Sequence, residues 1–349
     1  MYEEQFLEKY LQQNTIYHTL KNTNGMVVEI MNYGATITKI LVPNNKDSVT
    51  DVVLGYDSVL AYAQGSSCFG ATVGRNANRL RGASFTLNNT EYTLCDNDGG
   101  NNLHSGLDYY HKRFWTITAT NEQQITLTLH SPDGDQGYPG TLDITLTYTL
   151  TNENELKIEY SATPDQDTII NLTNHSYFNL DGHHSGTVLS QSLWLDSDAY
   201  TKTDSSSIPT GEFINLANTP MDFTNPKEVG TDIFTDIETL RLEKGYNHNW
   251  ILNNHGNFHK IGSLTSDATG IVMEIFTDCP GVQVYTANYV NQERGKENAL
   301  YNIHSGICFE TQQFPDAIHH PHFPSPIVKC EEHYNTCTSY KFSTIPSEK

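Results

Sequence analysis

The alternation of apolar and polar residues constrains the fold of this chain more than any other feature. It is clearest at residues 125–129, 142–150 and 156–160, where Leu, Ile and Tyr alternate with Thr, Asp, Lys or Glu. A period of two places the apolar side chains on one face, so these segments predict half-buried antiparallel strands. Runs rich in β-branched or aromatic residues predict further strands at 27–30, 36–41, 51–54, 84–87, 169–172, 271–276, 282–286 and 306–310.

Helical periodicity is restricted to the N-terminus. Phe6, Leu7, Tyr10 and Leu11 share a helical face, so we expect residues 1–14 to form a short helical extension. The stretch 201–246 is irregular and is expected to contain loops and one short helix. No repeat, low-complexity tract or Pro/Gly/Ser linker divides the 349 residues. We therefore predict an all-β fold with one domain over 1–349, a large antiparallel β-sandwich.

The charge balance limits the partners. Asp and Glu number 41 against 20 Lys and Arg, a formal net charge of -21. Such a surface repels phosphate backbones and anionic lipids, so we expect no nucleic-acid or membrane partner and instead a neutral polar ligand. No segment approaches the roughly 18 apolar residues of a membrane span, and the first twelve residues are acidic, unlike a signal peptide.

The six cysteines are too sparse for a disulfide framework. We expect a cytoplasmic protein with reduced thiols, in which Cys330 and Cys337 would pair only after export.

Two titratable residues are candidate proton carriers. Glu310 closes the apolar run 306–310, where it either faces solvent or points into a cleft with a raised pKa. His175 lies in the strand-like run 169–180, which contains three Asn together with Thr, Ser and Tyr. That setting suits a pocket that binds hydroxyl groups, whereas the alternative is a structural histidine bonded to a neighbouring strand. The residues alone leave both questions open.

Other polar residues are weaker candidates. His104 lies in a loop just before Gly106, where a binding role competes with simple solvation. Arg75, Arg79 and Arg81 form a local excess of basic residues that can donate hydrogen bonds to an oxygen-rich ligand.

Metal and cofactor signatures are weak in this sequence. The histidines at 183–184 and at 319–322 lack the spaced second pair of a zinc site, so we expect no metal. No GxSxG elbow is present, and no GxGxxG follows a strand, so serine hydrolases and nucleotide-cofactor enzymes gain no support.

The fragments occur together in an order that resembles the aldose 1-epimerase family, the galactose mutarotases. The matching segments cover roughly residues 15 to 345. They are NYGATI at 32–37, DVVLGYD at 51–57, GATVG at 70–74 with NR at 78–79, LH at 103–104, SPDG at 131–134, GYPG at 137–140, NHSYFNL at 174–180, GYNHNW at 245–250, PGVQVYT at 280–286 and FETQQFPD at 309–316.

The resemblance implies a β-sandwich with an open sugar-binding cleft, and interconversion of the α and β anomers of free aldohexoses such as galactose and glucose, without cofactor or metal. It implies that Glu310 is the general base at the C1 hydroxyl and that His175 is the general acid at the ring oxygen. The positions implied to hold the sugar are Asn78, Arg79, His104, Tyr177, Asn247 and Gln283.

One position departs from the family pattern. Where the family usually has Gly-Tyr/Phe-Asp-His, with the Asp on a sugar hydroxyl, this sequence has Asn247 in the segment 245–248. An amide loses the negative charge, so we expect weaker or altered sugar binding with the chemistry retained.

Two other functions remain open from the sequence. One is a sugar-binding or regulatory relative with weakened catalysis. The other is a hexose-phosphate epimerase, which would require Arg75, Arg79 and Arg81 to converge on one pocket. We expect a monomer or a homodimer.

Overall fold

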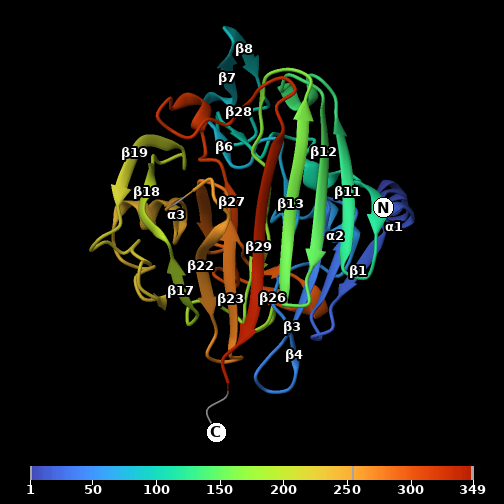
Figure 1. The fold of residues 1–349 in the computed structure, drawn as a ribbon, viewed down its shortest axis with the longest axis vertical. Coiled ribbons are helices and arrows are strands. Elements are labelled where there is room, and N and C mark those ends of the chain that lie inside the picture. The colour runs from blue at the N-terminus through green and yellow to red at the C-terminus, as the bar shows by residue number, and fades with distance from the viewer. Residues whose placement is uncertain (1, 254, 347–349) are drawn as a thin grey trace.

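Two large antiparallel sheets lie face to face around the main core (Figure 1). The computed structural model describes residues 2–253 and 255–346, so residues 1, 254 and 347–349 of the predicted domain lie outside the described residues. The larger sheet has nine strands, in the order β10 (Thr116–Thr120), β11 (Gln124–Ser131), β12 (Leu142–Leu150), β13 (Glu155–Pro164), β29 (Tyr334–Thr344), β23 (Ile271–Thr277), β22 (His259–Thr265), β17 (Ser192–Leu195) and β20 (Lys227–Glu228). The smaller has six, in the order β16 (Tyr177–Phe178), β27 (Ile307–Gln312), β24 (Gly281–Tyr285), β21 (Asn247–Leu252), β18 (Ser197–Thr203) and β19 (Pro209–Asn215).

The sequence alternation appears in the larger sheet as alternating burial. In β12, every second residue from Leu142 to Leu150 is buried, and the residues between them are exposed or half-buried. The neighbouring β13 repeats the pattern and pairs with β12 along its whole length. The buried face packs on the six-stranded sheet, where the Tyr340 hydroxyl of β29 donates to the backbone carbonyl of Phe309 in β27. The prediction of an antiparallel β-sandwich is confirmed.

The central strands of the six-stranded sheet are covered on both faces. Every residue of β24 and β27 is buried, which explains why 306–310 reads as an apolar run and not as an alternating one. One face of these strands packs on the larger sheet, and the other carries the side chains of the candidate site.

The remaining elements are short. A four-stranded sheet contains β1 (Tyr17–Lys21), β2 (Val27–Met31), β3 (Thr36–Pro43) and β4 (Val49–Asp51). Five strand pairs complete the described strands: β5 (Thr72–Val73) with β15 (Thr173–Asn174), β6 (Arg79–Leu80) with β9 (Asn102–Leu103), β7 (Ser84–Leu87) with β8 (Thr90–Thr93), β14 (Thr168–Ile169) with β28 (Ile327–Val328), and β25 (Glu293–Arg294) with β26 (Leu300–Tyr301). The described α-helices are α1 (Tyr2–Asn14), α2 (Val59–Gln64) and α3 (Glu238–Glu243).

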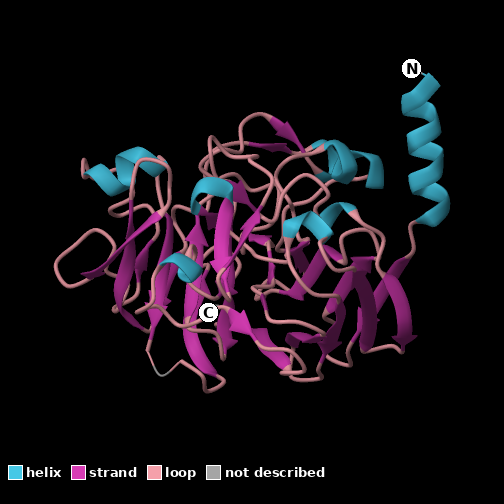
Figure 2. Ribbon diagram, turned by 90° about the horizontal axis from the view of Figure 1, so that it is seen from above, coloured by secondary structure: helices cyan, strands magenta, loops and turns pink. Residues whose placement is uncertain are grey.

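The N-terminal helix forms as expected, but it buries less than its apolar face suggests. Leu11 is buried, whereas Phe6, Leu7 and Tyr10 are 70%, 40% and 50% exposed. Helix α1 contacts α2, and Tyr10 packs edge-to-face on Phe114 with ring centroids 5.9 Å apart. Figure 2 shows α1 projecting at the edge of the molecule, clear of the strands.

The stretch 201–246 holds more regular structure than the prediction of loops and one short helix. It contains the expected helix α3, but also the end of β18 and the strands β19 and β20. The pair β18–β19 was missed because β19 is the edge strand of its sheet and is largely exposed, so its sequence carries no apolar alternation. The strand predicted at 51–54 is displaced, since β4 ends at Asp51.

One cluster of buried side chains extends through the sandwich from Leu20 to Phe342. None of the helices described in residues 2–253 and 255–346 has the length and apolar character needed to cross a membrane.

Candidate active site

A cavity of about 250 Å³ opens on the outer face of the six-stranded sheet. Its lining contains every predicted site residue except Gln283, together with residues that were not predicted to line a site. The predicted residues are Asn78, Arg79, His104, His175, Tyr177, Asn247 and Glu310, and the others are Ser66, Ser67, Cys68, Leu103, Tyr285 and Tyr289.

The register of the six-stranded sheet explains why residues far apart in sequence meet here. Residues directly opposite each other on antiparallel strands point to the same face, and so do residues two apart along one strand. One row across β21, β24, β27 and β16 consists of Asn247, Tyr285, Cys308 and Tyr177. The next row, two residues along each strand, consists of Asn249, Gln283 and Glu310. Both rows therefore face the cavity side of the sheet.

Glu310 lies within β27 and is only 3% exposed, so of its two alternatives the side chain takes the buried one and does not face solvent. Its Oε1 is 3.5 Å from Nε2 of His175, and its Oε2 is buried without a hydrogen-bond partner among the described residues. Burial raises the pKa of Glu310 from 4.5 to about 8, although the positive charge of Arg79 opposes that shift. A carboxyl group with this pKa exchanges a proton readily near neutral pH.

His175 lies between β15 and β16, because the strand-like run 169–180 is divided among short strands, of which β14 ends at Ile169 and not at 172 as predicted. The chain changes partner every few residues: β14 pairs with β28, β15 with β5 and β16 with β27. The imidazole ring stacks on Tyr177, with ring centroids 5.0 Å apart. Its Nδ1 lies 3.5 Å from the Cys308 thiol, so both ring nitrogens face side chains of β27. Burial lowers the pKa of His175 from 6.5 to about 4.

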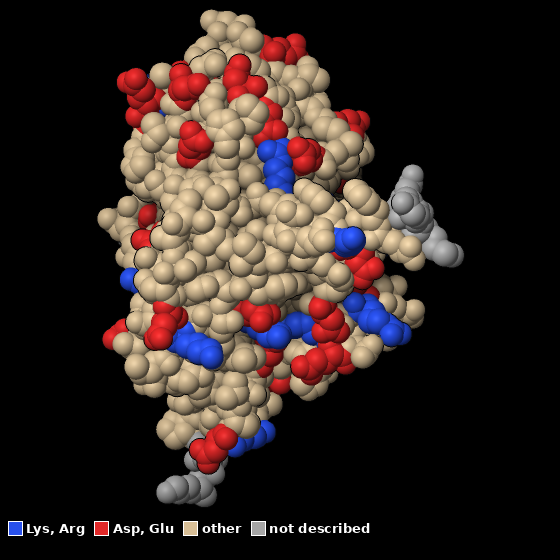
Figure 3. All heavy atoms as spheres, turned by 90° about the vertical axis from the view of Figure 1, so that its right-hand side faces the viewer, with Lys and Arg blue, Asp and Glu red and all other residues tan. Residues whose placement is uncertain are grey.

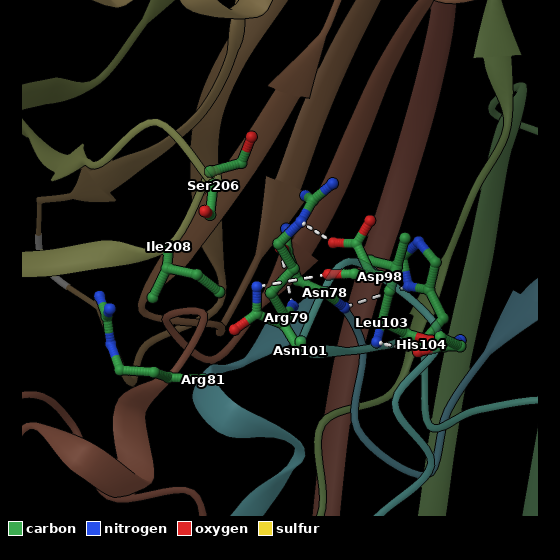
Figure 4. Close-up of polar contacts among 12 residues, drawn as sticks. Asn78, Arg79, Arg81, Asp98, Asn101, Leu103, His104, Ser206 and Ile208 are labelled. Atoms are coloured by element: carbon green, nitrogen blue, oxygen red, sulfur yellow. Dashed lines mark hydrogen bonds and ion pairs between the residues drawn. The ribbon is translucent and has the colours of Figure 1, made fainter.

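The pair β6–β9 brings Asn78, Arg79 and His104 together (Figure 4). The backbone N–H of Asn78 donates to Nδ1 of His104 over 3.1 Å, so the neutral ring carries its proton on Nε2. Burial lowers the pKa of His104 well below 6.5 and keeps the ring neutral. The Arg79 Nε donates to Oδ2 of Asp98 at 2.7 Å, a charge-assisted bond that orients the guanidinium.

Asn247 is held on both sides of its amide. Its Oδ1 accepts a hydrogen bond from Nε2 of Gln283 at 2.9 Å, and its Nδ2 donates to Oε2 of Glu243 at 2.8 Å. Gln283 does not line the cavity but lies behind Asn247, where its own Oε1 accepts from Gln312 at 3.5 Å.

Sequence and structure comparisons identify the family of the chain. The sequence profile of the aldose 1-epimerase family matches residues 17–341. The chain belongs to the aldose 1-epimerase family. Its relatives include the galactose mutarotase of Bos taurus, 38% identical over 90% of this chain and 91% of that protein. The aldose 1-epimerase of Haemophilus influenzae is 39% identical over 93% of this chain and 94% of its own length. The crystal structure of an aldose epimerase homologue from C. elegans superposes with a TM-score of 0.89 at 26% identity, covering 95% of this chain and 99% of that one.

The three clustered arginines of this aldose 1-epimerase family member do not converge. Arg75 is fully buried and donates to backbone carbonyls and to the side chain of Ser131. Arg81 pairs with Asp204 at 3.0 Å, and only Arg79 lines the cavity. The condition for a phosphate-sized arginine pocket is therefore not met.

The histidine clusters are engaged in other contacts. His319 pairs with the buried Asp316 at 2.6 Å, and Nδ1 of His183 lies 3.1 Å from the Tyr301 hydroxyl. Over residues 2–253 and 255–346, no group of three or more His, Cys, Asp or Glu side chains is arranged to hold a metal ion. The six cysteines are free thiols, including Cys330 and Cys337.

Tyr285 and residues 66–68 are among the lining residues that the sequence analysis did not predict. Tyr285 had a readable signal, since it lies two residues after Gln283 on one strand and so shares its face. Residues 66–68 had none, because the loop after α2 reaches the cavity only through the tertiary fold.

Proposed function

We propose that this protein interconverts the α and β anomers of free aldohexoses, with galactose and glucose as substrates. The observation that carries the proposal is the buried pair of Glu310 and His175, whose Oε1 and Nε2 lie 3.5 Å apart in the cavity wall. Relatives that are named galactose mutarotase or aldose 1-epimerase over nine-tenths of the chain support the same reaction.

The reaction needs one proton removed and one supplied. Glu310 takes the proton of the C1 hydroxyl while His175 gives a proton to the ring oxygen, so the C1–O5 bond breaks and the open aldehyde forms. Rotation about the C1–C2 bond presents the other face of the aldehyde, and closure reverses both transfers. Each general acid or base contributes about 10² to 10⁴ in rate, so these two groups suffice without metal or cofactor.

The pKa shifts of the two groups leave one proton on the pair over the physiological range. Burial raises the pKa of Glu310 to about 8 and lowers that of His175 to about 4, so between these values the pair holds a single proton. Moving it from Glu310 to His175 creates the base and the acid that the reaction requires. We therefore expect kcat/KM to fall below about pH 4, where the pair gains a second proton, and above about pH 8, where it loses its only one.

The thiol of Cys308 assists by fixing which nitrogen of His175 carries hydrogen. Burial raises the pKa of Cys308 well above 9, so the group stays a thiol. The thiol sulfur accepts the hydrogen of Nδ1, which leaves Nε2, the nitrogen that faces Glu310, free to take the proton of that carboxyl group. Nε2 is then the nitrogen of His175 that gives the proton to the ring oxygen of the sugar.

Donors and aromatic rings around the pair suit a neutral sugar. Arg79, His104 and Asn247 are proposed to bind its hydroxyl groups, and Tyr177 and Tyr285 present aromatic surface to its apolar face. On the molecular face in Figure 3, basic side chains lie beside acidic ones and form no continuous positive patch. The net charge of -21 likewise favours a free sugar over a sugar phosphate.

We further propose that the chain acts as one domain, as a monomer or homodimer, in the cytoplasm. Its six free thiols favour a reducing compartment.

Polarimetry tests the proposed function. Fresh α-D-galactose and α-D-glucose are dissolved with and without the purified protein, and the approach of optical rotation to equilibrium is followed. We expect a faster approach in proportion to protein concentration. Calorimetric binding of galactose without any acceleration would instead favour a sugar-binding relative, and neither binding nor acceleration would contradict the proposal outright.

A further inference from the structure

Glu243, at the end of α3, is a buried carboxylate whose position calls for an explanation. It is 1% exposed, and among the described residues no lysine or arginine forms an ion pair with it. Its Oε1 accepts a hydrogen bond from the Ser207 hydroxyl, and its Oε2 accepts the amide N–H of Asn247 at 2.8 Å. Burying a charge without a cationic partner is costly, so a carboxylate kept at this place points to a function.

That carboxylate determines the orientation of the Asn247 amide. A carboxylate accepts hydrogen bonds and cannot donate them, so only Nδ2 of Asn247 can face Glu243. The amide oxygen must then point the other way, where one lone pair receives Nε2 of Gln283 at 2.9 Å. An amide oxygen has a second lone pair, and Asn247 lines the cavity. A sugar hydroxyl is the donor that this lone pair suits.

The same contact makes the amide oxygen a better acceptor. Hydrogen bonds in series polarise one another, and the donation from Nδ2 to a charged group is the stronger kind. Glu243 therefore polarises the Asn247 amide and makes its oxygen more negative at the cavity wall.

We propose that Glu243 is a positioning residue for sugar binding, which holds the Asn247 amide with its oxygen toward the ligand and strengthens that oxygen as an acceptor. The inference rests on the proposed function in one respect, namely that the sugar occupies this cavity. It also explains the departure from the family pattern at Asn247. The family usually has a carboxylate at this position of the cavity wall, and here the carboxylate of Glu243 lies behind Asn247, joined to it by one hydrogen bond.

Because of this arrangement, we expect Asn247→Asp, which restores the aspartate usual in the family, to weaken sugar binding and not to strengthen it. In Asn247→Asp, a second carboxylate replaces the amide whose nitrogen lies 2.8 Å from Oε2 of Glu243. Two carboxylates at that separation repel, or one takes up a proton and stops acting as an ion. We expect a KM for galactose about tenfold or more above wild type, with kcat changed by less than about threefold, because the lost contact is made equally in the ground and transition states.

The double variant Glu243→Gln/Asn247→Asp provides the decisive measurement. Its new glutamine can donate to the new aspartate, so we expect its KM to return to within about threefold of wild type, while Glu243→Gln alone raises KM about three- to tenfold. Such strong non-additivity is the signature of two side chains in direct contact.

Glu155→Gln is the matched control. Glu155 also accepts a serine hydroxyl, from Ser339 at 2.7 Å, but lies in β13 of the other sheet, so its KM and kcat should equal those of wild type. Far-ultraviolet circular dichroism and melting temperatures for all variants separate loss of the contact from loss of the fold.

Calorimetric titration with galactose keeps the inference distinguishable from the proposed function. If the wild type binds galactose but does not accelerate mutarotation, the proposed function fails, and the same coupling is then read from the Kd values of the four proteins. The inference itself is overturned if Asn247→Asp binds galactose as tightly as wild type, or if the double variant binds no better than Asn247→Asp.

Discussion

The cavity has two groups of polar side chains that differ in how well their hydrogen bonds are satisfied. The proton-transfer pair is poorly satisfied: Oε2 of Glu310 has no partner among the described residues, and the two 3.5 Å contacts of His175 are long. The sugar-binding group is well satisfied, since Arg79 is held by Asp98 at 2.7 Å and both ends of the Asn247 amide have partners within 2.9 Å.

The difference follows from what each group has to do. A buried carboxyl without donors has a raised pKa and therefore moves protons near neutrality, so its missing hydrogen bonds are the source of its reactivity. A binding side chain gains from the opposite condition, because partners that already fix its geometry reduce the entropy lost when the ligand arrives. The predictions below probe this contrast, in order of decreasing effect.

Replacing the poorly satisfied pair should cost the most activity. Glu310→Gln removes the base without changing its size, and we expect kcat to fall by about 10³ to 10⁴ with little change in KM. His175→Asn should lower kcat by about 10² to 10³. Polarimetric kinetics with galactose measure both. An equal loss expressed only in KM would show that the pair binds the sugar without moving protons.

The raised pKa of Glu310 should make the free energy of unfolding decrease as pH rises. Its folded pKa of about 8 lies above the unfolded value of 4.5, so the favourable protonated state is fully present below about pH 4.5 and is lost as pH rises toward 8. At pH 7 the loss in the free energy of unfolding is on the order of 3 kcal/mol, and Glu310→Gln does not undergo it.

Urea denaturation at pH 5 and pH 8 measures the effect as the difference between wild type and Glu310→Gln. That difference should shift in favour of the variant at the higher pH, and the comparison cancels the titration of other groups. A constant difference across this range would contradict the raised pKa.

The strands of the fold could be predicted only in part from the sequence. Strand β12 was predicted with correct bounds because Leu, Ile and Tyr alternate with polar residues along it. The eleven-residue β29 was missed, since its Thr, Ser and Asn residues hide the alternation, although it occupies the middle of the larger sheet. Local pattern thus identifies strands with a clear amphipathic face or an apolar run, and misses β29, whose polar residues hide its buried face.

The site residues show the same limit. Residue type and resemblance selected Glu310 and His175, but the burial that shifts their pKa values results from β27 lying between two layers. Glu243 had no sequence signal, because a glutamate at a helix end is normally solvated. Its effect on Asn247 depends on a hydrogen bond that only the folded chain reveals.

Weakening the hydrogen bond between Arg79 and Asp98 should have a moderate effect on KM. Asp98→Asn keeps the shape of the residue but removes the charge that orients Arg79, so we expect KM for galactose to rise about five- to tenfold with kcat nearly unchanged. Asp108→Asn is the control, because Asp108 forms an exposed ion pair with Arg113 at 3.0 Å and should leave both constants unaltered. A fall in kcat as large as the rise in KM would place Arg79 in the chemical step.

The smallest effect is expected at Cys308, whose thiol contacts Nδ1 of His175. Cys308→Ala removes the acceptor of the Nδ1 hydrogen of His175, so the neutral ring no longer holds its proton on Nδ1 alone, and kcat should fall about three- to fivefold. Cys308→Ser keeps an acceptor and should stay within about twofold of wild type. Cys279→Ala, at another buried thiol, should have no effect on kcat. If the serine variant loses as much activity as the alanine variant at equal melting temperature, the thiol fills space and does not select the tautomer; if serine rescues, even the reactive pair depends on one satisfied hydrogen bond.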